Sequence, residues 1–482
     1  FQAEDGIRDF CLSRGLGDVY KRQGLEVPFA FSAKDLTADI PSSIEPGTEV
    51  SGATFTPNYR TGDFLDPKAR AKNTGVEYAQ GLVALGGDDE ELAKENIKVD
   101  VNGTGVVTLS IENVDSDTDE FAGRFVAIQP SDTDMGSKEP LDVKIIGEGM
   151  DKTILDFKDQ QSGAQGFLVT SNKVTLKDFA ILDAKGDALK VIGSKGIYMI
   201  NLRTEWTGGP KSSNGAYGFY PVESEDVLID GCVAIGASDA GIYVGQSKNI
   251  IVRNSVAQYN VAGIEIENSY YADVYNNLAS HNTGGILIFD LPDLPQQGGH
   301  HIRVFDNKSI DNDTDNFAPE GNIVGEVPRG TGIIIMANSD VEVFNNVISG
   351  NGTVNLSIVS YSDETDDPNY YPHPRRIQIH NNTYGPTGFD PDIETGDLAK
   401  ALYEISDGDM PDIFWDGVVS VSQMLFGQPE IDKLKIDENS DVSFLTISPI
   451  KYLLGFSKPV KTEKKQFNGI IDPLEPIVID GL

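Results

Sequence analysis

The chain has 482 residues, of which 39% are hydrophobic, 50 are glycine and two are tryptophan. This length allows a large core in one or two domains, and the glycine content favours short strands and turns over helices. With 38 basic and 75 acidic residues, the formal net charge is −37. Such a surface repels phosphate backbones, which argues against nucleic-acid binding, and no apolar run is long enough to span a membrane.

Residues 1–23 differ in character from the rest of the chain. They read FQAEDGIRDFCLSRGLGDVYKRQ, with four basic and four acidic residues and no repeat. They resemble translated sequencing-adapter sequence, which implies that they are a non-native artefact and that the native start, with any signal sequence, is missing. Once they are set aside, Cys232 is the only cysteine. No internal disulfide is then possible, and Cys232 is expected to be a small core residue.

Residues 24–140 show no repeat. They contain proline-rich and acidic stretches, and DDEELAKENI (88–97) is typical of a helix. Three interpretations stay open for this N-terminal region: a cap, early coils of the next domain, or a small separate β domain.

Residues 141–390 carry a repeat of 22 residues. GIYVGQSKNIIVRNSVAQYNVA (241–262) is followed at once by GIEIENSYYADVYNNLASHNTG (263–284), and the Gly-Ile start recurs at 285 and 332. Apolar residues alternate within each unit, which is the spacing of strands with one face inward. A unit with three short strands buries its apolar face only by stacking on copies of itself. The repeat therefore predicts an all-β fold, a right-handed parallel β-helix over residues 141–390.

A second landmark of the repeat is an apolar residue followed two positions later by Asn or Asp. We expect these residues to stack in a buried asparagine ladder that caps a tight turn in each coil. The members of this predicted ladder are Asn201, Asn254, Asn276, Asn345 and Asn381, with Asp178 and Asp306 in the same column.

Four insertions interrupt the period, at residues 205–217, 291–301, 311–331 and 362–376. Two precede a Gly-Ile strand and two follow one, so they should form the walls of a groove over its outward face. Carboxylates and aromatic rings on that face are typical of a sugar-binding groove, although exposed strand positions can also be polar for solvation alone. The predicted catalytic residues are Tyr243, Glu265, Glu267 and Asp239. The predicted substrate-binding residues are Trp206, Asn214, Tyr217, Tyr220, Gln246, Asn268 and Asp290.

Asp311, Asp313 and Asp315 have the alternating spacing of carboxylates in a calcium loop. They predict a Ca²⁺ site, and Ca²⁺ is the single cofactor considered. The glycine and distal glutamate of an EF-hand are not at the required positions, and solvation of a loop is the competing interpretation. Downstream, residues 391–482 lack the period and are predicted to form a C-terminal cap and tail, with a helix at LAKALYEI (398–405).

The segments WTGGPKSSNGAYGFYPV, AIGASDAGIYVGQS, NVAGIEIENS and GGILIFDLPDLPQQGG resemble a bacterial family of secreted parallel β-helix repeat proteins within the pectin-lyase-like superfamily. The resemblance covers residues 141–385 closely and MPDIFWDG (410–417) loosely. It implies an extracytoplasmic protein that is periplasmic, secreted or lipid-anchored. More distantly, the solenoid is similar to pectate lyases, polygalacturonases, alginate lyases and uronate epimerases.

Two functional hypotheses follow. The first is an extracytoplasmic carbohydrate-active protein, either a polysaccharide lyase, an epimerase or a hydrolase, with Tyr243 or Tyr220 as acid or base and Asp239, Glu267 or Asp290 in proton transfer or Ca²⁺ binding. A hydrolase would use a carboxylate pair such as Glu265 and Glu267. The second is a non-catalytic cell-envelope protein that binds a glycan or another secreted protein in the same groove.

Overall fold

The computed structural model describes residues 19–20, 26–27, 45–56, 63–65, 78–80, 103–115, 120–128, 143–160, 164–363, 365–447 and 464–479. The chain divides into two compact units, Phe1–Lys144 and Ile145–Leu482. None of the helices in these described segments has the length and apolar character needed to cross a bilayer.

The N-terminal unit contains antiparallel strands. Its largest sheet has the order β3–β6–β7, with a register shift between Ile111 and Asn113. Stacked coils pair in parallel, so these strands are not early coils of the β-helix. The helix predicted at residues 88–97 lies outside the described residues. The strands are β1 (Val19–Tyr20), β2 (Glu26–Val27), β3 (Glu49–Thr56), β4 (Asp63–Leu65), β5 (Tyr78–Gln80), β6 (Gly103–Asp115) and β7 (Glu120–Ile128).

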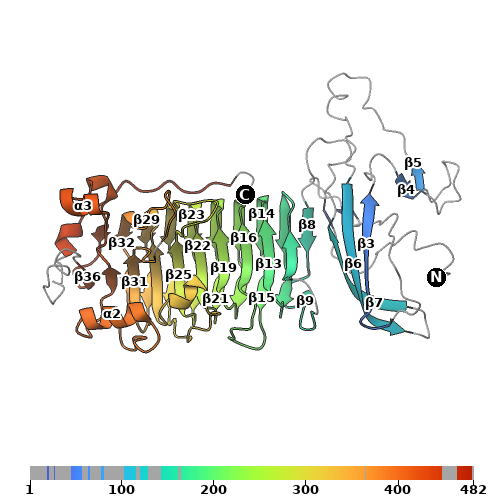
Figure 1. Cartoon of the computed structure of the whole chain (residues 1–482), viewed down its shortest axis with the longest axis horizontal. Coiled ribbons are helices and arrows are strands. Elements are labelled where there is room, and N and C mark those ends of the chain that lie inside the picture. The colour runs from blue at the N-terminus through green and yellow to red at the C-terminus, as the bar shows by residue number, and fades with distance from the viewer. Residues whose placement is uncertain are drawn as a thin grey trace, which may run out of the picture. The chain divides into compact units, whose positions relative to one another are not determined.

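The second unit is the predicted right-handed parallel β-helix, which the structure confirms (Figure 1). Each coil contributes one strand to each of three parallel sheets. The first sheet contains β10 (Gln165–Val169), β13 (Asp187–Ile192), β16 (Tyr217–Val222), β19 (Ala240–Gly245), β22 (Ala262–Glu267), β25 (Gly284–Phe289), β28 (Thr331–Met336), β31 (Val354–Val359), β34 (Ile413–Trp415) and β36 (Phe444–Thr446).

The other two sheets follow the same order along the chain. The second contains β8 (Val143–Ile146), β11 (Val174–Lys177), β14 (Lys195–Ile200), β17 (Glu225–Asp230), β20 (Lys248–Arg253), β23 (Tyr270–Tyr275), β26 (His300–Phe305), β29 (Ser339–Phe344), β32 (Arg375–His380) and β35 (Lys435–Asp437). The third contains β9 (Ile154–Asp156), β12 (Ala180–Leu182), β15 (Arg203–Glu205), β18 (Val233–Ile235), β21 (Val256–Gln258), β24 (Leu278–Ser280), β27 (Lys308–Ile310), β30 (Val347–Ser349) and β33 (Thr383–Tyr384).

Single residues in the left-handed conformation form the corners of each coil. In the coil that starts at β19, these are Gln246, Asn254 and Tyr259, with φ of 49°, 53° and 59°. Asparagine tolerates this conformation better than most residues because its short side chain can hydrogen-bond locally. The predicted column Asn201, Asn254, Asn276, Asn345 and Asn381 occupies one such corner, with φ between 50° and 56°.

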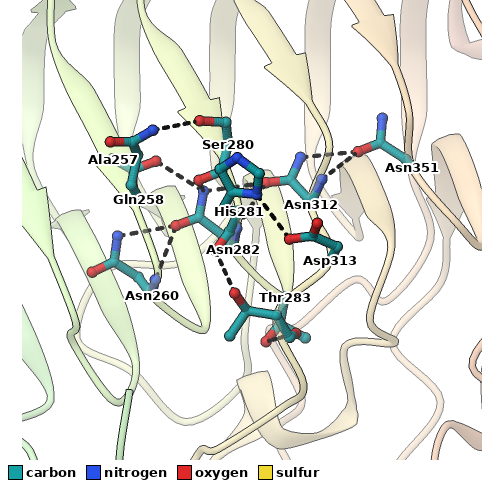
Figure 2. Close-up of polar contacts among 11 residues, drawn as sticks. Ala257, Gln258, Asn260, Ser280, His281, Asn282, Thr283, Asn312, Asp313 and Asn351 are labelled. Carbon is teal, nitrogen blue, oxygen red and sulfur yellow. Dashed lines mark hydrogen bonds and ion pairs between the residues drawn. The ribbon is translucent and has the colours of Figure 1, made fainter. Parts of the chain in front are cut away.

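The prediction that this column is a buried ladder is wrong, because a left-handed corner directs its side chain into solvent, and Asn254, Asn276 and Asn345 are exposed. The buried ladder lies one residue later. Its amides donate from each Nδ2 to the next Oδ1 over 3.0, 3.0 and 2.9 Å along Asn277, Asn307, Asn346 and Asn382. A second buried ladder runs through Asn260, Asn282, Asn312 and Asn351 at 3.0, 3.2 and 3.0 Å (Figure 2).

The inward-facing side chains form a continuous apolar core. In the first sheet, the aligned residues Ile242, Ile264, Ile286 and Ile333 are all fully buried. Cys232 is also fully buried, as its place in a valine-rich strand predicted. The alternation read from the repeat therefore identifies the core face correctly.

The first and second sheets continue beyond residue 390, because β34 and β36 extend the first sheet and β35 pairs with β32 in the second. The predicted helix at residues 398–405 is confirmed as α2 (Asp397–Ile405), and its Ala399 and Leu402 are buried. The remaining helical elements of the described residues in this unit are η1 (Ile323–Glu326), α3 (Val421–Phe426), η2 (Glu430–Asp432) and η3 (Lys464–Phe467).

The C-terminal segment runs back along the outward face of the second sheet (Figure 1). The backbone N–H groups of Ile471, Leu474 and Ile477 donate to side chains of β32, β29 and β23 over 2.6, 3.2 and 3.1 Å. At its end Ile479 packs on Leu228 and Ile251. The segment thus ties five coils together from outside.

Ile479→Ala is expected to reduce the free energy of unfolding by about 1–3 kcal/mol, because it empties a buried aliphatic contact. Thermal and urea unfolding measure this loss. Val478→Ala is the matched control, since the Val478 side chain is 76% exposed whereas that of Ile479 is 3% exposed. Equal unfolding curves for the two variants would show that the C-terminal segment does not stabilise the β-helix.

Candidate functional site

The predicted catalytic residues lie together on the outward face of the first sheet. Tyr243 of β19 is in register with Glu265 of β22, and Gly245 is in register with Glu267. A Cβ atom at Gly245 would approach the Tyr243 ring and hydroxyl to 2.2–2.5 Å. The glycine therefore leaves the room that lets the Tyr243 side chain reach toward Glu267.

We call this group the acidic cluster (Asp239, Glu265, Glu267 and Tyr243), and one hydrogen bond joins two of its members. The Tyr243 hydroxyl donates to Glu267 Oε1 over 2.7 Å. Asp239 Oδ2 accepts from Asn322 Nδ2 over 3.1 Å. Both carboxyl oxygens of Glu265 are buried without a hydrogen-bond partner among the described residues. A buried carboxyl without a partner is costly as a charge, so Glu265 is expected to hold a proton.

The acidic cluster is closed, whereas an open groove floor was expected. The exposed fractions are 4% for Tyr243, 1% for Glu265, 7% for Glu267 and 5% for Asp239. The insertion at residues 311–331 folds over these strands, and its Val324 and Val327 join the apolar cluster that contains Tyr243. This insertion was predicted to form a wall of the groove. It covers the groove instead, because its apolar residues are buried against the sheet.

Burial raises the pKa values of the carboxyl groups. The pKa of Asp239 rises to about 7, mainly through desolvation and then through the nearby charge of Glu267. Desolvation also raises the pKa of Glu267 to about 7, although the Tyr243 hydrogen bond opposes the rise. For Glu265, desolvation and the charges of Asp239 and Glu267 raise the pKa well above its ordinary range. The group can therefore hold and release protons near neutral pH.

Three tyrosine rings extend the acidic cluster toward earlier coils. The ring centroids of Tyr217, Tyr220 and Tyr243 lie 4.3–5.0 Å from one another. Tyr220 is half-buried, and Lys190 Nζ lies 4.5 Å from its ring centroid. One coil earlier, Leu168 is 44% exposed in register with Lys190. The outward face of the first sheet is thus accessible at β10, β13 and β16.

Most of the other predicted binding residues stabilise loops. Trp206 is buried and its Nε1 donates to the Ala184 carbonyl over 2.7 Å, and Asn214 donates to the carbonyls of Gly209 and Gly236. Asn268 and Asp290 are buried and hydrogen-bond the backbone of the 291–301 insertion.

Gln246 forms a corner of its coil, with a buried side-chain oxygen that has no partner among the described residues. Sequence reasoning missed Asn322, which carries no repeat signal. It also missed Lys190, which extending the register by one coil would have identified.

The predicted Ca²⁺ ligands do not converge. Asp311 forms a left-handed corner, Asp313 Oδ1 lies 2.9 Å from His281 Nδ1 (Figure 2), and Asp315 Oδ1 lies 3.3 Å from Arg329 Nε. No group of three or more His, Cys, Asp or Glu side chains among the described residues is arranged to hold a metal ion. The spacing was read correctly, but Asp313 and Asp315 pair with different basic side chains and the three carboxylates do not form a metal site.

A cleft of about 1370 Å³ lies beside the covering insertion. It is lined by residues of that insertion, of the 291–301 insertion and of segment 389–396, and by Tyr361, Asp363 and Tyr403. Its carboxylates are Asp293, Asp315, Glu320, Glu326, Asp363, Asp390, Asp392 and Glu394, with Arg329 the cation among its lining residues. The insertion thus covers the acidic cluster and also lines an acidic cleft.

Two families match different parts of the chain. Residues 1–150 match the manganese-stabilising protein / photosystem II polypeptide family. Residues 162–291 and 211–384 match the right-handed β-helix region. The chain is similar to both. Each match covers less than half of the 482 residues, and the β-helix match agrees with the fold described above.

The curated relatives concern the N-terminal part. Photosystem II extrinsic protein O of Synechococcus elongatus is 49% identical over 128 residues, which are 26% of this chain and 46% of that protein. Oxygen-evolving enhancer protein 1 of Euglena gracilis is 42% identical over 146 residues, 30% of this chain and 40% of that protein. The chain spans less than half the length of these relatives.

The family match begins at residue 1, so the comparisons do not support setting residues 1–23 aside as foreign. Sequence reasoning did not recognise the photosystem II family in residues 24–140, because this part shows neither a repeat nor a spaced motif. Among the alternatives considered for the region, the antiparallel strands of this separate unit agree with a small separate β domain.

The solved structures concern the β-helix. The mannuronan C-5 epimerase AlgE4 A-module of Azotobacter vinelandii has a TM-score of 0.36 and 14% identity, covering 61% of this chain and 78% of that one. The Dettilon tailspike protein has a TM-score of 0.31 and 14% identity, covering 62% of this chain and 59% of that one. Likeness at this level concerns the fold alone.

Proposed function

We propose that the β-helix unit processes a polysaccharide and that the acidic cluster performs the proton transfers. The observation that carries this proposal is the 2.7 Å hydrogen bond from Tyr243 to Glu267 in a buried cluster that also holds Glu265, whose carboxyl has no hydrogen-bond partner among the described residues. Structural carboxylates are normally charged and paired, whereas these are buried and hold their protons to near-neutral pH. Such groups can serve as acid and base in the same site.

Burial assigns the roles within the cluster. It raises the pKa of Tyr243 well above 10, so the tyrosine is a proton donor and not a phenolate base at neutral pH. Glu267 or Asp239, with pKa values of about 7, supplies the base. A lyase or epimerase would use this base on a sugar-ring C–H proton, and a hydrolase would use two carboxyl groups on the glycosidic bond.

A screen of polymers against the purified chain tests this proposal. Uronic-acid polymers and neutral glycans are incubated between pH 5 and pH 8. Absorbance from unsaturated products, new reducing ends and exchange of ring protons with D₂O are then measured. We expect a signal from at least one polymer. Its absence with every polymer in all three measurements would contradict a catalytic role.

The alternative is a protein that binds glycans without chemistry. Two observations support this alternative. Tyr243 and Glu267 are almost completely buried, so a glycan cannot contact them in the closed structure. Lys190, Tyr220 and Leu168 form an accessible apolar and cationic strip on the same sheet. In this case Tyr220→Ala should weaken glycan retention on affinity gels, and no product should appear. Retention unchanged by Tyr220→Ala would contradict this alternative.

Location and partners are also proposals. We infer an extracytoplasmic protein, whose envelope partner would be a glycan or another secreted protein, and cell fractionation tests this. For residues 1–150 we propose an association with photosystem II, on the basis of the 49% identity to an extrinsic protein of that complex. Co-sedimentation with photosystem II particles stripped of their extrinsic proteins tests it, and a chain that stays in the supernatant would contradict it.

A further inference from the structure

The covering insertion is anchored at its two ends. Its C-terminal end is also tied to a neighbouring loop, where the Arg329 N–H donates to Asp392 Oδ2 over 3.2 Å and Arg329 Nη1 donates to Asp390 Oδ2 over 2.7 Å. Thr314 N–H and Oγ1 donate to the carbonyls of Asn282 and His281, and Gly330 N–H donates to the carbonyl of Thr283. The three carbonyls belong to His281, Asn282 and Thr283, and Asn282 is a member of the second asparagine ladder (Figure 2). Residues 315–329, which we call the lid, lie between the anchors.

Inside the lid, Asn316 organises the chain. Its Nδ2 donates to the carbonyls of Val324, Gly325 and Val327 over 2.9, 3.2 and 3.0 Å. Gly321, with φ of 91°, turns the chain before η1, and Gly330, with φ of 83°, lies just beyond the lid. The lid can therefore keep its own hydrogen bonds while it moves relative to the sheet.

Apolar side chains and one amide hold the underside of the lid on the sheet. Val324 and Val327 are buried in the apolar cluster, the partly buried Phe317, Ala318 and Ile323 pack against it, and the Asn322 side chain donates to Asp239. Beneath them Glu265 has no hydrogen-bond partner among the described residues. The Asn322 amide thus takes the hydrogen bond to Asp239 that a hydroxyl or amide group of a substrate would otherwise make. The closed lid thus blocks the site that it covers.

We propose that the lid closes over the acidic cluster when the cluster is protonated and opens when the cluster is ionised, which makes pH the regulator of access. This inference rests on the proposed function only for its biological meaning, because the movement itself needs no substrate.

The direction of the pH dependence of lid closure follows from burial of the carboxyl groups. Closure removes Asp239, Glu265 and Glu267 from water and raises each pKa, so the closed state binds more protons than the open state. Closure is fully favoured below the ordinary pKa values of about 4. It weakens as pH rises through the raised values of about 7 for Asp239 and Glu267. Each unit of pKa change on closure shifts the equilibrium about tenfold.

Other charged groups face the cluster from the elements packed around it. Arg375 lowers the pKa of Asp290, and Asp290 raises that of Glu267. On the sheet these groups are Asp187, Lys190, Tyr217, Tyr220, Glu223 and Asp290. On the lid, Asp315, Glu320, Glu326 and Arg329 line the cleft. On the neighbouring loop, Tyr361 and Tyr370 pack against the apolar cluster that contains Tyr243. Asp187 raises the pKa of Asp239 and Asp290 raises that of Glu267, so these neighbouring carboxylates also oppose ionisation of the closed cluster.

Hydrogen exchange of the full chain without glycan tests the lid. Mass spectrometry follows peptides from residues 315–329 at pH 5 and pH 8, with rates corrected for intrinsic exchange. We expect an opening equilibrium on the order of tenfold or more larger at pH 8. The double variant Asp239→Asn/Glu267→Gln cannot ionise at these positions and should remove most of that difference. Glu320→Gln, which removes an exposed carboxyl on the lid itself, is the control and should keep it.

A second measurement covers the case in which the double variant does not fold. Val324 is fully buried under the lid, so a Val324→Cys thiol should be labelled by iodoacetamide faster at pH 8 than at pH 5, relative to a free thiol at each pH. Equal protection of the lid from exchange and from labelling at the two pH values would contradict the proposed pH-dependent opening. The result is independent of the glycan screen, because neither measurement needs a substrate.

Discussion

Glu267→Gln and Tyr243→Phe are each expected to lower kcat/KM on any polymer found by the screen by roughly 10²–10⁴-fold. Gln at position 267 keeps the shape but cannot take a proton, and Phe at position 243 keeps the ring but cannot donate one. Because the two groups share the 2.7 Å hydrogen bond, the double variant should lose little more than the worse single variant. Steady-state kinetics of the three variants measures this.

The pH profile separates catalysis from simple packing in these variants. If Glu267 is the base and the lid opens to admit substrate, kcat/KM of the wild type should rise with pH and level off by the pKa of about 7 that Glu267 has in the closed site. Glu148→Gln, at an exposed glutamate outside the acidic cluster, should leave both rate and profile unchanged. Full activity of Glu267→Gln would remove Glu267 from the mechanism, and full activity of Tyr243→Phe would remove the tyrosine.

Asn307→Ala is expected to lower the free energy of unfolding by about 3–5 kcal/mol, because it leaves several buried polar groups without partners. The Asn307 side chain donates to the Val274 carbonyl and to Asn346, and it accepts from the backbone and side chain of Asn277. Removing one amide therefore breaks the ladder in both directions. Urea unfolding followed by circular dichroism measures the loss.

The control for this prediction is the neighbouring corner. Asn276→Gly should cost well below 1 kcal/mol, since Asn276 is exposed and glycine accepts its φ of 55° without strain. If Asn276→Gly were the more destabilising change, the predicted corner column would be the structural ladder after all. Similar small losses for both variants would show that the amide stacks add little to the stability of the coils.

Local patterns were enough to identify the β-helix. The alternation at Ile242/Val244 and Ile264/Ile266 identified the inward face, and the 22-residue period placed Tyr243 beside Glu265. Both results depend on spacing alone, because a strand alternates its side chains and a stacked coil keeps its register. The same spacing put Glu265 and Glu267 on one face. Burial raises both pKa values, and the charge of Glu267 raises the pKa of Glu265 further.

Local sequence patterns could not predict which residue forms each corner of a coil. Asn276 and Asn277 are adjacent and identical in type, yet the first is exposed and the second is buried. The choice depends on which of the two adopts the left-handed conformation, and only the stacked neighbours decide this. The spread of Asp311, Asp313 and Asp315 to separate partners has the same origin.

By itself, the sequence determined the fold class, the core face and the group of residues that meet at Tyr243 and Glu267. Only the tertiary structure decided that this group is closed. The covering insertion has no period, and its Val324 and Asn322 find their partners, Tyr243 and Asp239, about 80 residues away in the chain. Burial there depends on how a long loop folds back, which is set by long-range apolar and polar contacts that no local pattern in the sequence encodes.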